Sequence, residues 1–314
     1  MQKKYDATIV GLYILDVLGR PVSKIPDGGN VEFIEELRLT VAGTAGGTVV
    51  DCAKLGLKTL AVGAVGDDEK ADFVIATLDK FGVDTSGFER INNVPTSATI
   101  LNVRPNGDRP ALHLRGASDH FLPPSKEKID IFDCKVFHLG GTGLLKKLDG
   151  QASIDLLKEA KERGCITTWD LIAATEDTLT IVEPLLPYID YFMPSIEEAS
   201  VMSGKKDPEE AAKFYIDKGV KNCVLTMGEK GSLYMNKDNK IITPAYDIKV
   251  VDTTGCGDAF DAGMITALAK DIDLEASLKF ATATSGLVAT GLGSDAGIIS
   301  YEDTIQKMEN FKIK

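Results

Sequence analysis

The sequence predicts an α/β protein in which a mostly parallel central sheet has helices on both faces and carries a small β-sheet lid. Short apolar runs alternate with segments of helical period, as in βαβ units. Two stretches rich in turn residues interrupt this alternation. The length of 314 residues fits one large α/β domain. We therefore expect a single domain over residues 1–314, with a lid formed by insertions at about 16–40 and 96–116.

Short runs rich in β-branched residues predict the strands of the central sheet, at 7–11, 59–65, 135–139, 165–169, 188–193 and 222–226. Helical segments are expected between them at 47–55, 70–81, 151–163, 196–203 and 208–218. In the first of these, Val49, Cys52 and Ala53 recur at helical spacing, whereas Asp51 and Lys54 fall on the other face. Strands that alternate with helices pair in parallel and are covered on both faces.

The two interruptions predict the lid. Residues 16–40 contain several Gly and Pro residues between apolar–polar alternations such as 31–34. Residues 96–115 are typical of two strands around the turn sequence Pro105-Asn106-Gly107-Asp108. Both stretches are expected to leave the main sheet as β-ribbons above the carboxyl ends of its strands.

Charge and composition limit the possible partners. Asp and Glu number 47 against 35 Lys and Arg, and no basic block occurs, so nucleic acid and anionic membrane are not expected as partners. No apolar run approaches the roughly 20 residues of a membrane span, and the N-terminus has no signal-peptide pattern. The five cysteines are odd in number and scattered, which favours free thiols. We expect a cytoplasmic protein.

Residues 250–263 carry the clearest chemical signal. A strand end is followed by a turn with Gly255 and Gly257 and then by an apolar helix over 259–269. Backbone N–H groups and the helix dipole make such a turn an anion site, suited to a phosphate in transfer. Asp258 would repel that anion, so a carboxylate there makes sense as the acceptor of the attacking hydroxyl's proton. The alternative is an ordinary helix start with an acidic first turn.

The same residues carry a family resemblance. Asp252-Thr253-Thr254-Gly255-Cys256-Gly257-Asp258 resembles the D-T-x-G-A-G-D signature of the ribokinase-like (PfkB) carbohydrate kinases, with Cys256 in place of Ala. The resemblance extends over nearly the whole chain and implies the ribokinase-like three-layer fold. It implies a catalytic turn made of Gly255, Cys256, Gly257 and the base Asp258.

Two segments near the N-terminus resemble the family's substrate motifs. Residues 11–16 are similar to its first strand and would make Asp16 an acceptor for sugar hydroxyls, although Ile14 replaces the usual Asn. Residues 42–47 resemble its glycine-rich motif, which implies that Gly43, Gly46 and Gly47 lie against the substrate. Gly47 stands where the family usually has Asn. Both departures make ribose itself a less expected acceptor.

The resemblance also implies the cofactors ATP, Mg²⁺ and K⁺. The T-x-G-x-x-G turn at 226–231 and the loop at 291–297 would bind ATP, through Thr226, Gly228, Gly231 and Gly293. Residues 194–199 are similar to an N-x-x-E motif in which Glu198 would act on Mg²⁺ indirectly. Asp252, Thr253 and Gly291 would belong to a monovalent-cation site, and we expect activity to depend on that ion.

The function expected from the resemblance is ATP-dependent phosphorylation of a hydroxymethyl group on a sugar or sugar-like substrate. A nucleoside kinase is one alternative, in which Tyr13 or Phe33 could face a base. A phosphosugar kinase is another, with Arg104, Arg109 and Arg115 as candidate cations. A catalytically silent sugar- or nucleotide-binding regulator is the last. The sequence does not name the acceptor or the hydroxyl that is phosphorylated.

Two further expectations follow. Cys256 lies at a helix N-terminus, where the dipole favours thiolate, so its modification is expected to inactivate the enzyme. Free ribbon edges and an apolar lid face, with Val31, Phe33 and Ile34 as candidates, predict a homodimer formed through the lids.

Overall fold

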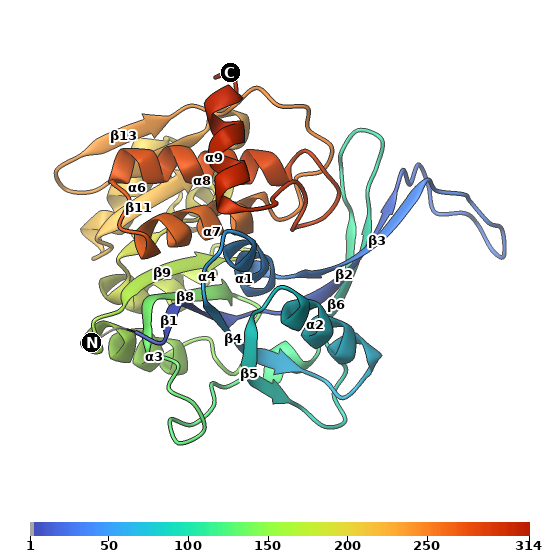
Figure 1. Cartoon of the computed structure of the whole chain (residues 1–314), viewed down its shortest axis with the longest axis horizontal. Helices are drawn as coiled ribbons and strands as arrows, with labels where there is room; N and C mark the ends of the chain where they lie inside the picture. The colour runs from blue at the N-terminus through green and yellow to red at the C-terminus, as the bar shows by residue number, and fades with distance from the viewer. Residues whose placement is uncertain (1–2) are drawn as a thin grey trace.

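A nine-stranded sheet forms the body of the protein and a separate four-stranded sheet projects from it (Figure 1). The computed structural model describes residues 3–314. The order of the large sheet is β13-β12-β11-β10-β9-β8-β1-β4-β5, and that of the small sheet is β3-β2-β6-β7. The pairs from β5 to β11 are parallel, while β12 and β13 add antiparallel at one edge. The expected α/β class with a mostly parallel sheet and a small β-sheet lid is therefore confirmed.

The strands are β1 (Tyr5–Gly11), β2 (Ile14–Arg20), β3 (Glu36–Ala42), β4 (Thr59–Val65), β5 (Asp84–Arg90), β6 (Ala98–Asn102), β7 (Ala111–Leu114), β8 (Cys134–Thr142), β9 (Ile166–Leu171), β10 (Tyr191–Phe192), β11 (Asn222–Thr226), β12 (Ser232–Met235) and β13 (Lys240–Thr243). The α-helices are α1 (Thr44–Lys54), α2 (Glu69–Lys80), α3 (Gln151–Glu162), α4 (Thr178–Val182), α5 (Ile196–Ser203), α6 (Pro208–Asp217), α7 (Cys256–Ala269), α8 (Leu274–Val288) and α9 (Tyr301–Asn310). Short 3-10 helices span Ala117–His120, Glu183–Tyr188 and Gly228–Lys230.

The large sheet is buried on both faces because successive side chains of a strand point to opposite sides. In β1, Ala7 and Ile9 pack in one core with α1, α2, α7, α8 and α9. Val10 of the same strand packs in the other core, with α3, α5 and α6. The helices thus form two layers with the sheet between them. Among the described residues, no helix has both the length and the apolar character needed to cross a bilayer.

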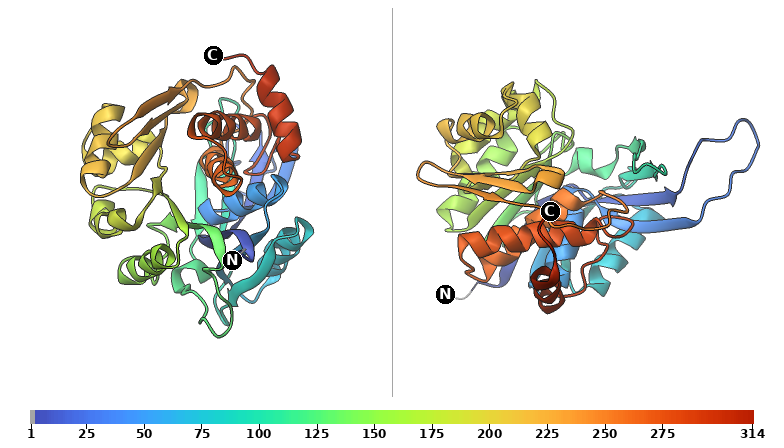
Figure 2. Two further views of the ribbon diagram at one scale, coloured as in Figure 1. Left: turned by 60° about the vertical axis from the view of Figure 1, so that its left-hand side comes forward. Right: turned by 90° about the horizontal axis from the view of Figure 1, so that it is seen from above.

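The lid sheet begins where the chain leaves β1 at residues 12–13, and its long β2–β3 loop extends far from the body (Figure 2). Strand pairing aligns Thr40, Asp16, Thr99 and His113 in one row across the four strands. The adjacent row consists of Leu39, Val17, Ile100 and Leu112 and faces the opposite side. One face of the lid therefore carries the polar row with Asp16, and the opposite face carries the apolar row.

Candidate active site

The polar face of the lid covers a cavity of about 520 Å³ at the carboxyl ends of the central strands. Asp16, Thr99 and His113 line it from the lid, while Gly43 and the turn 253–258 line it from the body. The lid thus supplies the roof of a cavity whose floor is the anion turn predicted from the sequence. Carboxyl ends of parallel strands are the usual place for a ligand in such sheets.

The turn at 252–258 needs glycine at Gly255. Gly255 has φ of 77°, and a Cβ there would lie 2.4 Å from Cα of Ser294. The left-handed residue lets the chain reverse and start α7 at Cys256, with Gly257 and Asp258 in its first turn. Nearly all of the helix that follows is buried. A rigid helix therefore fixes the position of the Asp258 carboxylate.

Asp258 lies against the backbone of α1. A Cβ on Gly47 would lie 2.5 Å from Oδ2 of Asp258, so only glycine leaves room for the carboxylate in this position. Thr48 Oγ1 donates to the main-chain oxygen of Asp258 at 3.2 Å. The pKa of Asp258 is raised to about 7, chiefly by burial and then by the charge of Asp16, while Arg109 opposes the rise. Asp258 can therefore accept a proton near neutral pH.

Asp16 faces the same cavity from β2. Its side chain is 4% exposed, and its Oδ1 has no hydrogen-bond partner among the described residues. Burial raises the pKa of Asp16 to about 7, and a hydrogen bond from Thr99 and the charge of Arg109 moderate the rise. Thr99 Oγ1 in turn lies 3.1 Å from Nδ1 of His113. An unsatisfied buried carboxylate is suited to hydroxyl groups of a bound acceptor.

Two more carboxylates line the cavity. Glu198 in the first turn of α5 accepts from the Ser195 main-chain N at 3.1 Å and from its Oγ at 2.7 Å. Asp170 near the end of β9 is 6% exposed. Burial raises the pKa of both groups, and the charge of Glu198 raises that of Asp170 further. Asp170 was missed from the sequence, although its place directly after the apolar run 165–169 is the signal that could have revealed it.

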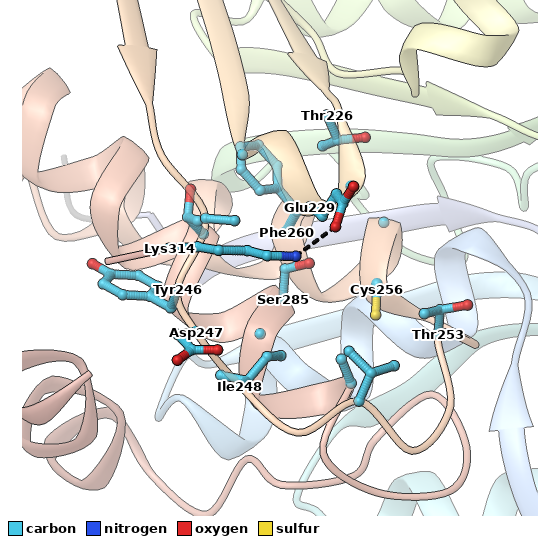
Figure 3. A pocket seen from close by; sticks show the side chains of 18 residues that line it. Thr226, Glu229, Tyr246, Asp247, Ile248, Thr253, Cys256, Phe260, Ser285 and Lys314 are labelled. Carbon is cyan, nitrogen blue, oxygen red and sulfur yellow. Dashed lines mark hydrogen bonds and ion pairs between the residues drawn. The ribbon is translucent and has the colours of Figure 1, made fainter. Parts of the chain in front are cut away.

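A second cavity, of about 330 Å³, opens on the other side of the turn (Figure 3). Thr226, Gly228 and Gly231 line it from the segment between β11 and β12, and Thr282 and Ser285 line it from α8. Glu229 and Lys314 meet across it as an ion pair. The two cavities share three lining residues, Thr253, Cys256 and Gly257. The anion turn therefore lies where the two cavities meet.

Some expected site residues lie elsewhere. Gly293, expected at ATP, lines neither cavity; its N–H donates to Oδ2 of Asp252 at 3.0 Å under the lid. A Cβ on Gly46 would meet Val41 and Tyr13, so Gly46 serves packing on α1 and not substrate contact. Gly291 lies beside Ala296, outside both cavities. Spacing in the sequence could not separate these glycines from Gly43, which does line the cavity under the lid.

The expectation that Cys256 is a thiolate is wrong. Burial raises the pKa of its thiol to about 12, and this desolvation outweighs the positive end of α7 and the charge of Arg109. Cys256 is half-buried between the two cavities. Its place there agrees with the sequence, but the raised pKa does not favour a thiolate.

The aromatic residues proposed to face a nucleoside base do not line the cavity. Tyr13 is fully buried; its hydroxyl donates to the main-chain oxygen of Ile9 at 2.8 Å and its ring packs on Phe88. Phe33 is 90% exposed on the long β2–β3 loop. Beside its polar residues, the cavity under the lid is lined by aliphatic side chains such as those of Ile14, Leu101 and Leu144. This arrangement removes the observation that favoured a nucleoside acceptor.

Asp252 belongs to the expected monovalent-cation site. This carboxylate is 1% exposed and accepts from Thr254 N at 3.0 Å, Thr254 Oγ1 at 2.8 Å and Gly293 N at 3.0 Å. No Lys, Arg or His of residues 3–314 forms an ion pair with it. A buried carboxylate that has only neutral donors retains a charge to compensate, which fits a cation between Asp252 and the 291–297 loop.

Comparison with known proteins identifies the family. Residues 6–300 match the pfkB family of carbohydrate kinases. The chain is 25% identical to deoxyribokinase of Salmonella typhi over 307 residues, covering 95% of this chain and 96% of that protein. It is 28% identical to the probable fructokinase-5 of Arabidopsis thaliana over 308 residues, covering 92% and 95%.

Solved structures agree with that assignment. Ribokinase from Thermotoga maritima superposes with a TM-score of 0.81 at 25% identity, over 98% of this chain and all of the other. A putative ribokinase II from E. coli in complex with ATP and Mg²⁺ has the same fold, with a TM-score of 0.84 at 20% identity, over 97% and 99%. The match over nearly the full length shows that this chain is a carbohydrate kinase of the pfkB family, with the ribokinase-like fold.

Proposed function

We propose that this enzyme transfers the γ-phosphoryl group of ATP to a hydroxymethyl group of a sugar or sugar-like acceptor. One observation carries the proposal. The cavity under the lid, here called the acceptor cavity, and the second cavity meet at the Gly255–Gly257 turn, with Asp258 beside it. ATP would lie along Thr226, Gly228 and Gly231 with its phosphates at the turn. The acceptor would lie under the lid against Asp16 and Gly43.

The arrangement supports direct transfer between the two ligands. As the acceptor oxygen bonds to the γ-phosphorus, its proton passes to Asp258, and the bond from that phosphorus to the bridging oxygen of ADP breaks. The backbone N–H groups of the turn would stabilise charge on the phosphoryl oxygens. The transition state is loose, so the proton leaves late and a carboxylate of modest basicity suffices.

Mg²⁺ is proposed with ATP, where it would supply charge neutralisation on the phosphate oxygens. Glu198 and Asp170 are the carboxylates proposed to hold it, through water. Three or more His, Cys, Asp or Glu side chains do not gather into a direct metal site in residues 3–314, which suits an ion that arrives with the nucleotide. The putative ribokinase II from E. coli, which has the same fold, was solved in complex with ATP and Mg²⁺.

K⁺ is proposed for the space beside Asp252. An ion there would neutralise a buried carboxylate next to the turn and hold the 291–297 loop in place. We expect faster turnover in potassium than in tetramethylammonium salts at equal ionic strength. Equal rates in the two salts would remove the ion from the proposal.

A homodimer is also proposed. The apolar face of the lid leaves Leu39, Ile100 and Leu112 at least 43% exposed, in a contiguous row. The loop residues Val31, Phe33 and Ile34 add further exposed apolar surface. A second copy of the chain is the partner that would cover this face.

The proposed function does not specify which sugar or sugar-like compound is the acceptor. A panel of substrates tests the proposed function and identifies the acceptor. ADP release is measured with sugars, deoxysugars, sugar phosphates and nucleosides, each with ATP and Mg²⁺. We expect turnover with at least one sugar or sugar-like alcohol and phosphorylation at its hydroxymethyl carbon, read by ³¹P–¹H correlation. Turnover restricted to nucleosides would contradict the proposal.

A further inference from the structure

The acceptor cavity has a marked imbalance of charge. Four carboxylates line it, from Asp16, Asp170, Glu198 and Asp258. Arg109 supplies the one guanidinium or ammonium group among its lining residues in the described chain. A phosphoryl group that moves from ATP to the acceptor enters this space with negative charge. Among the lid residues that line the cavity in the described chain, Arg109 is the one with a permanent positive charge to compensate it.

Arg109 lies on the inner side of the lid, two residues before β7. Within residues 3–314, its guanidinium has neither an ion pair within 4 Å nor a hydrogen bond, whereas its neighbours in the lid are engaged. Arg104 donates to the main-chain oxygen of Val22 at 2.9 Å, and Arg115 pairs with Asp119 at 3.2 Å. Arg109 is therefore the lid arginine that is available to a ligand.

The charge of Arg109 acts at both ends of the reaction path. Its positive charge opposes the rise that burial causes in the pKa of Asp16 at the acceptor side. It opposes the same rise for Asp258 and Cys256 at the turn. Arg109 lines the same cavity as these three residues, of which Asp16 lies at the roof and Cys256 and Asp258 lie at the turn. This is the region that the phosphoryl group crosses if the proposed function holds.

We propose that Arg109 contacts the phosphoryl group during transfer, from the side opposite the backbone N–H groups of the Gly255–Gly257 turn. The inference rests on the proposed function and adds a catalytic residue to it. The planar guanidinium donates two parallel hydrogen bonds to phosphoryl oxygens, which a single ammonium cannot do. Because Arg109 belongs to the lid, the contact would link full catalytic strength to the presence of the lid over the acceptor.

Substitution of Arg109 by Gln tests the contact. With a neutral acceptor from the panel, Arg109→Gln should lower kcat by about 10²–10³-fold, the usual loss of one stabilising donor group. The acceptor KM and the ATP Kd should change less than about threefold, because the contact forms during transfer. Arg109→Lys should keep an intermediate kcat, since charge remains but the paired donors are lost. Arg104→Gln and Arg115→Gln are matched controls in the same lid and should keep kcat.

Two results would overturn the inference. One is a kcat of Arg109→Gln within about threefold of wild type. The other is an unchanged kcat with a raised KM for anionic acceptors alone, which would make Arg109 a group for an acceptor's own anion. Thermal unfolding of all four variants excludes a folding defect as the cause of a loss.

A binding measurement separates this inference from the identity of the acceptor. ADP with Mg²⁺ and aluminium fluoride mimics the phosphoryl group in transfer, and it should bind wild type more tightly than ADP alone. Arg109→Gln should lose at least about tenfold of that gain, while Arg104→Gln keeps it. An equal gain in wild type and Arg109→Gln would overturn the role of Arg109, whatever the panel shows about the acceptor.

Discussion

At the scale of single residues, Asp258 is the group on which the proposed chemistry depends. Its carboxylate is fixed at the first turn of α7, beside the anion turn. Asp258→Asn keeps the shape but removes the base, so kcat should fall by about 10²–10⁴-fold, the contribution of general-base catalysis. The measurement is kcat with the best acceptor of the panel, together with the ATP Kd by calorimetry.

The nucleotide provides the internal control for that variant. ATP affinity should stay close to wild type or increase slightly, because a negative charge near the γ-phosphate disappears. The free energy of unfolding should not fall, since a buried carboxylate is replaced by a neutral amide of similar shape. A variant that retains more than about a tenth of wild-type kcat would require another base.

The pH profile should report the same carboxylate. The pKa of Asp258 is raised to about 7 in the folded protein, and the base acts only when deprotonated. With both substrates below their KM, the rate should therefore rise with pH to a plateau above about 7 and fall tenfold per unit below it. Asp16 also titrates near 7, so the apparent value belongs to the pair.

Asp16→Asn tests the origin of that value. The negative charge of Asp16 helps to raise the pKa of Asp258, so its removal should move the acid limb to lower pH. The absolute rate should fall as well, because the acceptor loses a hydrogen-bond partner. A limb that stays in place would show that the charge of Asp16 does not raise the pKa of Asp258. A wild-type limb below pH 5 would show that burial does not raise it either.

Residue types and spacing predicted which residues form the site better than they predicted the protonation states of those residues. Asp258 and Asp16 were identified from the resemblance, and both face the acceptor cavity. Asp170 and Arg109 also line this cavity. Asp170 was missed near the end of its strand. Arg109 was named only as a candidate cation for a phosphosugar, because solvated charge is the common role in a turn-rich ribbon. The thiolate expected at Cys256 failed because a sequence pattern does not reveal desolvation.

At the scale of elements, the contact between α1 and α7 positions the base. Gly47→Ala would place a methyl group 2.5 Å from the present position of Asp258 Oδ2, so the carboxylate must move. Misplacement by about 1 Å can cost about 10²-fold in rate, so kcat should fall by about 10- to 10²-fold. Ala is the better helix former by roughly 1 kcal/mol, so the free energy of unfolding should not decrease much.

The neighbouring glycine of α1 is the matched control. A methyl group on Gly46 would have Val41 Cγ1 at 3.2 Å as its nearest contact and would not touch Asp258. Gly46→Ala should therefore gain the same helix preference with kcat near wild type. Equal kcat in both variants, measured beside urea unfolding, would mean that α1 does not constrain Asp258.

Element prediction succeeded where periodicity was strong. The segments 59–65, 196–203 and 222–226 coincide with β4, α5 and β11. The strand expected at 188–193 is only Tyr191–Phe192, because Pro184 and Pro187 favour a 3-10 helix over Glu183–Tyr188. The helix α8 was not anticipated because it is buried nearly all around, so its small and apolar residues leave no clear polar face.

At the scale of the whole molecule, the lid carries both part of the site and the surface proposed for a dimer. Its polar face carries Asp16 and Thr99 over the acceptor, while its apolar face lies on the other side of the same strands. The sequence predicted the two ribbons and an apolar surface near Val31 and Phe33. It did not predict that Leu39, Ile100 and Leu112 align across three strands, because strand register depends on pairing between distant segments.

The exposed apolar face of the lid predicts that the protein forms a dimer in solution. Light scattering at micromolar concentration should give twice the 33.7 kDa of one chain. Leu112→Arg places a charge on the exposed apolar face, at the edge strand β7, where Leu112 is 65% exposed in one copy. A second copy would have to bury that charge twice by symmetry, so the dimer dissociation constant should rise at least about 10²-fold.

Ile242→Arg is the control for that substitution. Ile242 is 60% exposed on β13, at the sheet edge away from the lid (Figure 1). The same change of side chain there should leave the dimer intact, which separates an effect of the lid face from a general effect of added charge. A monomer mass for the wild type would end the proposed dimer, and a dimer that survives Leu112→Arg would move its interface off the lid. Because Asp16 belongs to the same lid, loss of the dimer in Leu112→Arg should also raise the acceptor KM more than the ATP KM.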